Sequence, residues 1–191
     1  MAWQEPTNPV GTYDPAYMTN LYGASWTTAW NTCIYGSPMQ TGANVLSNCT
    51  GYAQGRMLRL WLLNHPEFNP STQQTHPFTI FNLDAGQWKQ IALDNGYTVL
   101  DEPRAGTVFV TGSHVGVIEK EVNGEWWVSE SGYGNINPYQ YGVGIYKDGN
   151  KWYAMHASIH EIIGFIVIPD FSPEPIGDRT GYDRRRRYRN I

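Results

Sequence analysis

The sequence contains little cysteine, little charge and no long apolar run, and each shortage narrows what the chain can be. Its two cysteines, Cys33 and Cys49, allow at most one disulfide, and we expect both thiols to be reduced. No apolar stretch approaches the roughly 20 residues that span a bilayer, so we expect no membrane partner. Residues 1–15 lack the basic and apolar regions of a secretory signal peptide, so we expect none. Charged residues make up 16% of the chain, which argues against wholesale disorder.

Sequence motifs for a bound phosphate, metal or cofactor are also missing. The chain has neither a glycine-rich phosphate loop nor the G-x-S-x-G turn of serine hydrolases. His156 and His160 are four residues apart, as in a metal-binding pair on one helix face, but no third ligand stands at a suitable spacing. We therefore expect no metal and no cofactor. His65 and His76 stand beside prolines in a polar segment, and we expect both to be solvated.

Charge is distributed unevenly along the chain. Residues 179–191 contain six Arg and one Asp, for a net charge of +5, whereas residues 1–178 contain seven basic and sixteen acidic side chains, for a net charge of −9. The run Arg184–Arg187 is typical of a solvated tail, and it is also a candidate contact for an acidic partner. No other feature indicates recognition of bases, so nucleic acid is not the partner that we expect.

The composition favours a turn-rich α+β protein of one domain. Hydrophobic residues make up 41% of the chain and aromatic residues 14%, enough to fill a core, and 20 Gly and 12 Pro supply turns. Apolar residues at helical spacing predict a helix from Cys49 to about Asn64. Ser47 or Asn48 can cap its start, and Pro66 stops it.

A second helix and then a series of strands are predicted further along. Asp84 and Gly96 bound the second helix, as its N-cap and its C-terminal stop. From Gly106 the apolar period changes to two, which is typical of strands. The predicted strands lie within residues 106–131, 151–155 and 164–171. The expected layout is α+β, with N-terminal helices packed on an antiparallel β-sheet.

Cys49 is the candidate nucleophile, because it stands at the start of the first predicted helix. Unpaired backbone N–H groups and the positive end of the helix dipole favour a thiolate there. The same N–H groups can hold the oxyanion that forms when a carbonyl is attacked. The alternative is a buried cysteine that fills a gap in the core.

His114 is the candidate base for this thiol. It opens a predicted strand, "SHVGVIEK", directly after a glycine-containing turn, so the imidazole stands at the rim of the sheet. A neutral imidazole can take the thiol proton and later return one to a leaving amine. The alternative is a histidine with a structural role only.

Glu130 is the candidate group that orients His114, but the spacing raises a difficulty. If Asn123-Gly124 formed a strict two-residue turn, Glu130 would point to the opposite face of the sheet from His114, because faces alternate along a strand. A turn of odd length or a β-bulge would bring the two side chains to one face. The prediction of Glu130 as the third member of the site therefore requires such a turn or bulge.

These residues, in this order, resemble a CHAP domain (cysteine, histidine-dependent amidohydrolase/peptidase) of the kind found in bacteriophage lysins. The stretches that carry the resemblance are "NCTGYAQGRM", "DAGQWKQIALDNGY", "PRAGTVFVTGSHVGVIEKEVNGEWWVSESGYG" and "IIGFIVIPDF". The resemblance implies a papain-like α+β fold. It divides the chain into an irregular lead-in (1–30), a CHAP-like catalytic domain (31–172) and a Pro/Arg-rich C-terminal tail (173–191).

The resemblance also implies roles for individual residues. Cys49 matches the nucleophile, His114 the base and Glu130 the acid that orients the base. Asn48, directly before the nucleophile, is a candidate donor to the oxyanion, or alternatively a simple helix cap. Gly132 stands where the family often has Asn, so no polar help is expected from that position.

The implied activity is hydrolysis of an amide bond in peptidoglycan by a Cys-His-Glu site. The bond is either the N-acetylmuramoyl-L-alanine amide or one within the stem peptide or cross-bridge. The implied setting is a phage-encoded protein that acts at the bacterial cell wall, either released in the host or carried on the virion. The alternative is a tail-associated virion protein whose CHAP-like domain serves in wall penetration or assembly, with the Arg-rich tail bound to other virion proteins.

Overall fold

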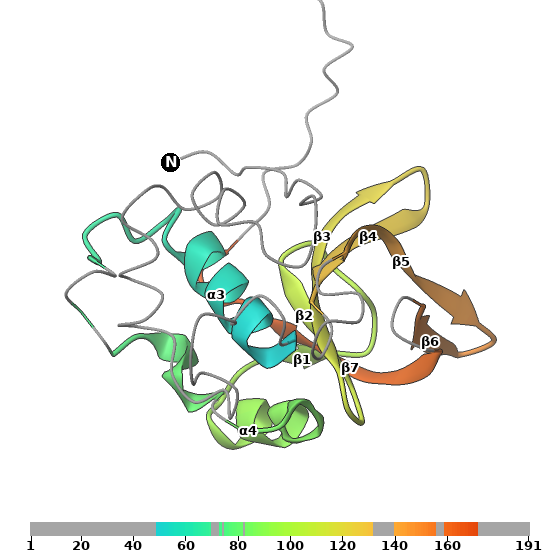
Figure 1. Cartoon of the computed structure of the whole chain (residues 1–191), viewed down its shortest axis with the longest axis horizontal. Coiled ribbons are helices and arrows are strands. Elements are labelled where there is room, and N and C mark those ends of the chain that lie inside the picture. Colours follow the sequence, from blue (N-terminus) through green and yellow to red (C-terminus); the bar gives the residue numbers. More distant parts are fainter. Residues whose placement is uncertain are drawn as a thin grey trace, which may run out of the picture.

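The computed structural model describes residues 49–69, 73, 75–81, 83–131, 140–155 and 159–171. The helical elements are α3 (Cys49–Trp61), the 3-10 turns η2 (Pro77–Ile80) and η3 (Ala85–Gln87), and α4 (Trp88–Asp94). The strands are β1 (Val99–Leu100), β2 (Thr107–Thr111), β3 (Val115–Val122), β4 (Glu125–Glu130), β5 (Gln140–Asp148), β6 (Lys151–Ala154) and β7 (His160–Val167) (Figure 1).

The sheet closes on itself. Its strand order is β1-β7-β2-β3-β4-β5-β6, every pair is antiparallel, and β7 also pairs with β6. Six strands therefore form a closed barrel, and β1 is added on the outside of the circle through β7. The predicted papain-like α+β fold, with N-terminal helices packed on an antiparallel sheet, is wrong. The described part of the chain is mostly β, with two short helices outside a barrel.

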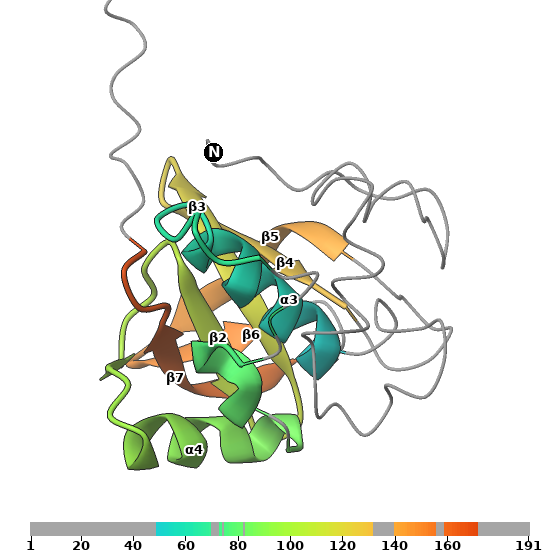
Figure 2. The same ribbon diagram turned by 90° about the vertical axis from the view of Figure 1, so that its left-hand side faces the viewer.

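Two apolar clusters stabilise this arrangement. One fills the barrel, and its members come from β2 to β7: Phe109, Ile118, Val128, Ile145, Ala154, Ile162 and Phe165. The other lies between the helices and the barrel wall, and it joins α3, η2 and α4 to the outward faces of β2 and β3. α3 lies against β3 and β4, whereas α4 lies against β1 and β7 (Figures 1 and 2).

The first described helix begins at the predicted residue but ends earlier, whereas the α-helical part of the second begins four residues after the predicted Asp84 and ends one residue before Asn95. α3 starts at Cys49 and ends at Trp61, three residues before the predicted Asn64. The second helical segment starts with η3, and Asp84 occupies the N-cap position without making a side-chain capping hydrogen bond. The helix caps predicted at residues 47–48, the lead-in (1–30) and the tail (173–191) lie outside the described residues.

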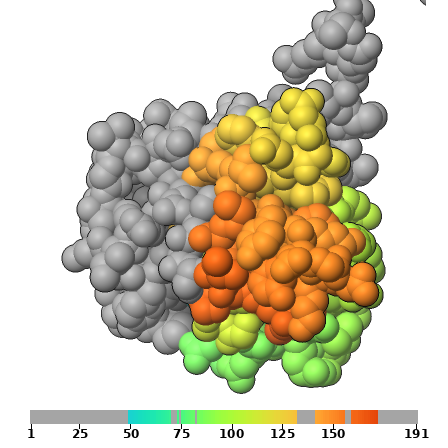
Figure 3. Space-filling model, turned by 90° about the vertical axis from the view of Figure 1, so that its right-hand side faces the viewer, coloured from blue at the N-terminus to red at the C-terminus, as the bar shows by residue number. Residues whose placement is uncertain are grey.

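The face of the barrel formed by β5, β6 and β7 lies at the surface of the molecule (Figure 3). Four large hydrophobic side chains are exposed on these strands or directly beside them: Tyr146, Met155, Ile159 and Ile163. In the part of the chain that the structure describes, neither helix is long and apolar enough to cross a membrane.

Candidate active site

Cys49 stands apart from the rest of its helix. Every other residue of α3, from Thr50 to Trp61, is buried, whereas Cys49 is partly exposed. Within the described residues α3 begins at Cys49, and N–H groups in the first turn of an α-helix lack the carbonyl partner that later turns have. Its place at the start of α3 and its partial exposure make Cys49 the candidate nucleophile of the site.

A β-bulge resolves the difficulty over Glu130. Asn123 and Gly124, with φ of 54° and 84°, do form a two-residue turn between β3 and β4. The register then shifts between Ile118 and Lys120, so Glu119 is an extra residue on β3. This single insertion exchanges the two faces of β3 for all residues that precede it.

The reversal of faces along β3 places His114 and Glu130 on one face of the sheet. Beyond the bulge Val117 pairs with Ser129, so Gly116 lies opposite Glu130. His114 is two residues before Gly116 and therefore shares the face of Glu130. His114 Nε2 and Glu130 Oε2 are 2.6 Å apart, and both residues are buried, with 6% and 3% of their surface exposed.

The imidazole of His114 contacts both other members of the predicted site. Burial by itself would lower the His114 pKa, but hydrogen bonds to Cys49 and Glu130 and the negative charge on both partners outweigh it and raise the pKa to about 9. Because Glu130 engages Nε2, Nδ1 is the nitrogen left for the Cys49 proton. The structure thus brings Cys49 and Glu130 to the same imidazole, with the His114–Glu130 contact at 2.6 Å.

Thr111, at the end of β2, fixes the backbone that carries His114. The His114 N–H donates to Thr111 Oγ1 at 2.9 Å, and the Thr111 N–H donates to the His114 carbonyl oxygen at 2.8 Å. The Ser113 N–H also donates to Thr111 Oγ1, at 3.3 Å. The turn between β2 and β3 is therefore closed on both sides, which restricts where the imidazole can lie.

Glycine is required at position 116 by the close approach of Phe109 and Glu130. A Cβ built there would lie 2.5 Å and 2.6 Å from ring atoms of Phe109 and 2.9 Å from the Glu130 Cβ. We expect Gly116→Ala to lower the free energy of unfolding by about 1–3 kcal/mol, because a packed core must move to admit a methyl group.

Urea denaturation measures the effect of Gly116→Ala, and Gly142→Ala is its matched control. A Cβ at Gly142 in β5 has no atom within 4 Å, so its change in stability should stay within about 0.5 kcal/mol. Equal stability of the Gly116→Ala protein and the parent would contradict the close packing of Glu130 on β3.

Asn48 and Gly132 lie outside the described residues, so the structure gives no position for the predicted oxyanion donor or for the site where the family often has Asn. The amide donors that it does describe are those of the first turn of α3, beginning with Cys49. Among the described residues, these N–H groups are the candidates for the role of oxyanion donor.

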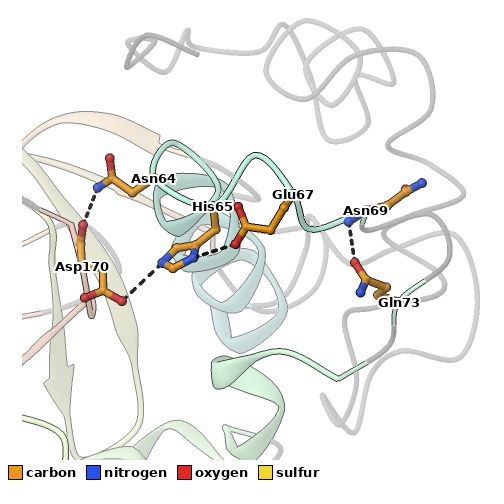
Figure 4. Close-up of polar contacts among 6 residues, drawn as sticks. All are labelled: Asn64, His65, Glu67, Asn69, Gln73 and Asp170. Carbon is orange, nitrogen blue, oxygen red and sulfur yellow. Dashed lines mark hydrogen bonds and ion pairs between the residues drawn. The ribbon is translucent and has the colours of Figure 1, made fainter.

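A second polar cluster lies at the far end of α3 (Figure 4). His65 stacks on Trp61 with ring centroids 3.9 Å apart, and its two ring nitrogens lie 3.2 Å from Glu67 Oε1 and 3.2 Å from Asp170 Oδ2. The Asn64 side chain donates to the Asp170 carbonyl oxygen. This cluster ties the loop after α3 to the segment after β7, and His65 is partly buried rather than freely solvated.

Two other histidines lie within the described residues, and the structure places both differently from the prediction. His76 is buried, and its Nδ1 accepts a hydrogen bond from the Phe78 N–H at 3.3 Å, so the prediction that it is solvated is wrong. His160 begins strand β7 rather than standing on a helix, and His156 lies outside the described residues. Within the described ranges no group of three His, Cys, Asp or Glu side chains is placed to hold a metal ion.

Several residues that hold the site together were not predicted from the sequence. Arg56 of α3 and Glu119 of β3 are buried charges, and they pair with each other. Arg56 gave a signal as a charge directly before Met57 and Leu58, because charges are buried almost only when paired. Glu119 gave no such signal, because Lys120 and Glu121 follow it. Gly116 carried a weaker signal, a glycine inside a strand.

Comparison with known proteins found no matching family model, no matching curated protein and no matching solved structure.

Proposed function

We propose that the chain is a cysteine amidohydrolase that cleaves an amide bond of bacterial peptidoglycan. The observation that carries the proposal is the contact of the partly exposed Cys49, at a helix start, with the His114 imidazole, which is itself held by Glu130 at 2.6 Å. The proposal depends on this site and not on the fold, since one arrangement of catalytic groups recurs on unrelated folds.

The first half of the reaction forms an acyl-enzyme. His114 Nδ1 takes the Cys49 proton, and the sulfur attacks the amide carbonyl carbon. The new S–C bond moves the carbonyl π electrons onto oxygen, and N–H groups of the first turn of α3 stabilise that negative charge. When the oxyanion collapses, the C–N bond breaks and the amine leaves with the proton from His114. The products are a thioester on Cys49 and a free amine.

The second half regenerates the thiol. His114 removes a proton from a water molecule, which attacks the thioester carbon and breaks the C–S bond. The carboxylic acid leaves, and the proton on His114 again balances the thiolate of Cys49. Throughout both halves Glu130 accepts a hydrogen bond from His114 Nε2, so it fixes the ring orientation and favours the imidazolium.

Peptidoglycan is proposed as the substrate because the stretches around Cys49, His114 and Glu130 resemble those of CHAP domains from phage lysins. Within that polymer, both the amide that joins muramic acid to the stem peptide and the amides of the peptide itself suit a thiolate nucleophile.

Mass spectrometry of digested peptidoglycan tests the proposal. The protein is incubated with purified cell walls, and we expect soluble fragments in which water has been added across one kind of amide bond. A free lactyl carboxyl group on muramic acid identifies an amidase, whereas a new N-terminus inside the stem peptide or cross-bridge, with the lactyl amide intact, identifies an endopeptidase. Intact walls, or products cut only between sugars, would overturn the proposal.

A further inference from the structure

The carboxylate of Glu119, the extra residue of the bulge, is tied to two other elements. Arg56 Nε donates to Glu119 Oε1 at 2.8 Å and Arg56 Nη2 donates to Oε2 at 2.7 Å, which is a bidentate ion pair. Ser129 Oγ donates to Oε1 at 2.5 Å. All three residues are buried, with exposures of 4%, 1% and 0% for Glu119, Arg56 and Ser129. One carboxylate therefore joins helix α3, strand β3 and strand β4.

The positions of these residues relate them to the site. Arg56 is seven residues after Cys49, which is two helical turns, so both side chains leave α3 on the same side. Cys49 contacts His114 and Arg56 contacts Glu119, so α3 runs alongside β3 in the same direction. Ser129 directly precedes Glu130 on β4. Each member of the network is thus linked by rigid backbone to one member of the Cys49–His114–Glu130 chain.

The bulge at Glu119 indicates that the network of Arg56, Glu119 and Ser129 selects the register of β3 against β4. Without the extra residue at Glu119, His114 and Glu130 would lie on opposite faces of the sheet. A buried ion pair is weak evidence of stabilisation, because removing two charges from water offsets much of their attraction. Its stronger attested use is to select one register among alternatives.

We propose that Arg56, Glu119 and Ser129 are positioning residues of the hydrolase site: their buried network fixes the bulge that turns His114 toward Glu130 and fixes α3 so that Cys49 meets His114. The term hydrolase site rests on the proposed function. The positioning of Cys49 and His114 by the network does not require that peptidoglycan is the substrate. None of the three residues touches the reacting atoms.

NMR titration of the His114 imidazole tests the inference without any substrate. In the parent we expect a midpoint near pH 9, the value that contact with Cys49 and Glu130 produces. In Glu119→Gln the bulge loses its charged anchor, so His114 should lose those partners and its midpoint should fall by at least about one unit toward 6.5. Wall lysis should fall at least about tenfold at the same time.

Two further variants separate positioning from charge and from folding. Arg56→Met combined with Glu119→Leu removes one positive and one negative charge, so the net charge near His114 is unchanged. A fall in the His114 midpoint then cannot come from a lost carboxylate charge alone. Ser129→Ala removes one hydroxyl and should fold even if the other variants do not, with a smaller fall in the midpoint. The control is Glu161→Gln, which removes a carboxylate paired with Lys151 on an exposed part of the barrel and should change nothing.

The titrations of these variants support or overturn the positioning role of the network. Folded variants that lack the network and keep the parental His114 midpoint would overturn the positioning role. If Glu119→Gln and the double variant both fail to fold, an unchanged midpoint in Ser129→Ala overturns it. A shifted midpoint in a protein that never cuts cell walls would support the positioning role and reject the proposed function.

Discussion

Cys49→Ala should fold like the parent and lyse purified cell walls roughly 10⁶-fold more slowly, which is the scale of loss when a hydrolase loses its nucleophile. Without the sulfur no thioester can form, and the remaining His114–Glu130 pair has no group to activate. Cys49 is partly exposed at the first position of α3, so its truncation should alter the free energy of unfolding by less than about 1 kcal/mol.

Turbidity of a cell-wall suspension measures this loss, and thermal unfolding shows whether the variant is folded. Cys33→Ser is the matched control, because it removes the other cysteine of the chain and should lyse walls at the parental rate. Parental lysis by Cys49→Ala would mean that another residue performs the chemistry.

Glu130→Gln should lower the rate of wall lysis by roughly 10²-fold and narrow its pH range. In the parent the leaving amine takes its proton from His114, so the rate should fall as the pH rises through about 9, where His114 loses that proton. Glutamine removes the negative charge that favours the imidazolium, so the His114 pKa moves down toward 6.5. The alkaline limb of the rate profile must therefore move to lower pH, and never to higher pH.

A pH series of initial lysis rates locates this limb for the parent and the variant. Glu125→Gln provides the control, since Glu125 is exposed at the other end of the same strand and should leave the limb near pH 9. An alkaline limb that stays in place in Glu130→Gln would show that Glu130 does not act on His114.

The local elements were largely predictable, but the closure of the barrel was not. Helical spacing located the start of α3, and alternating apolar residues located β2, β3, β4, β6 and the second half of β7. β5 was missed because Gly142 and Gly144 interrupt its pattern and glycine is rare in strands. Without β5 no path leads from β4 to β6, so the circle of strands could not be completed from the sequence.

The site shows a different limit of sequence reasoning. The residue types and their order pointed to Cys49, His114 and Glu130, and alternation along the strands showed that a bulge was one way to unite the last two. Nothing local placed the bulge at Glu119, because the residue that holds it, Arg56, lies 63 positions earlier in the chain. A pairing over that separation is a property of the folded structure.

The strand pairs of the closed barrel differ in length, and this difference favours the site. Among the described residues, β6 and β7 meet at two residue pairs, Tyr153 with Glu161 and Ala154 with His160, whereas β3 and β4 meet at five. Counting strands around the circle, the β3–β4 junction lies diametrically opposite the β6–β7 junction. Transient breathing should begin at the shorter junction, where the fewest bonds must break. The barrel can thus open between β6 and β7 while the β3–β4 pair keeps the His114 imidazole and the Glu130 carboxylate aligned.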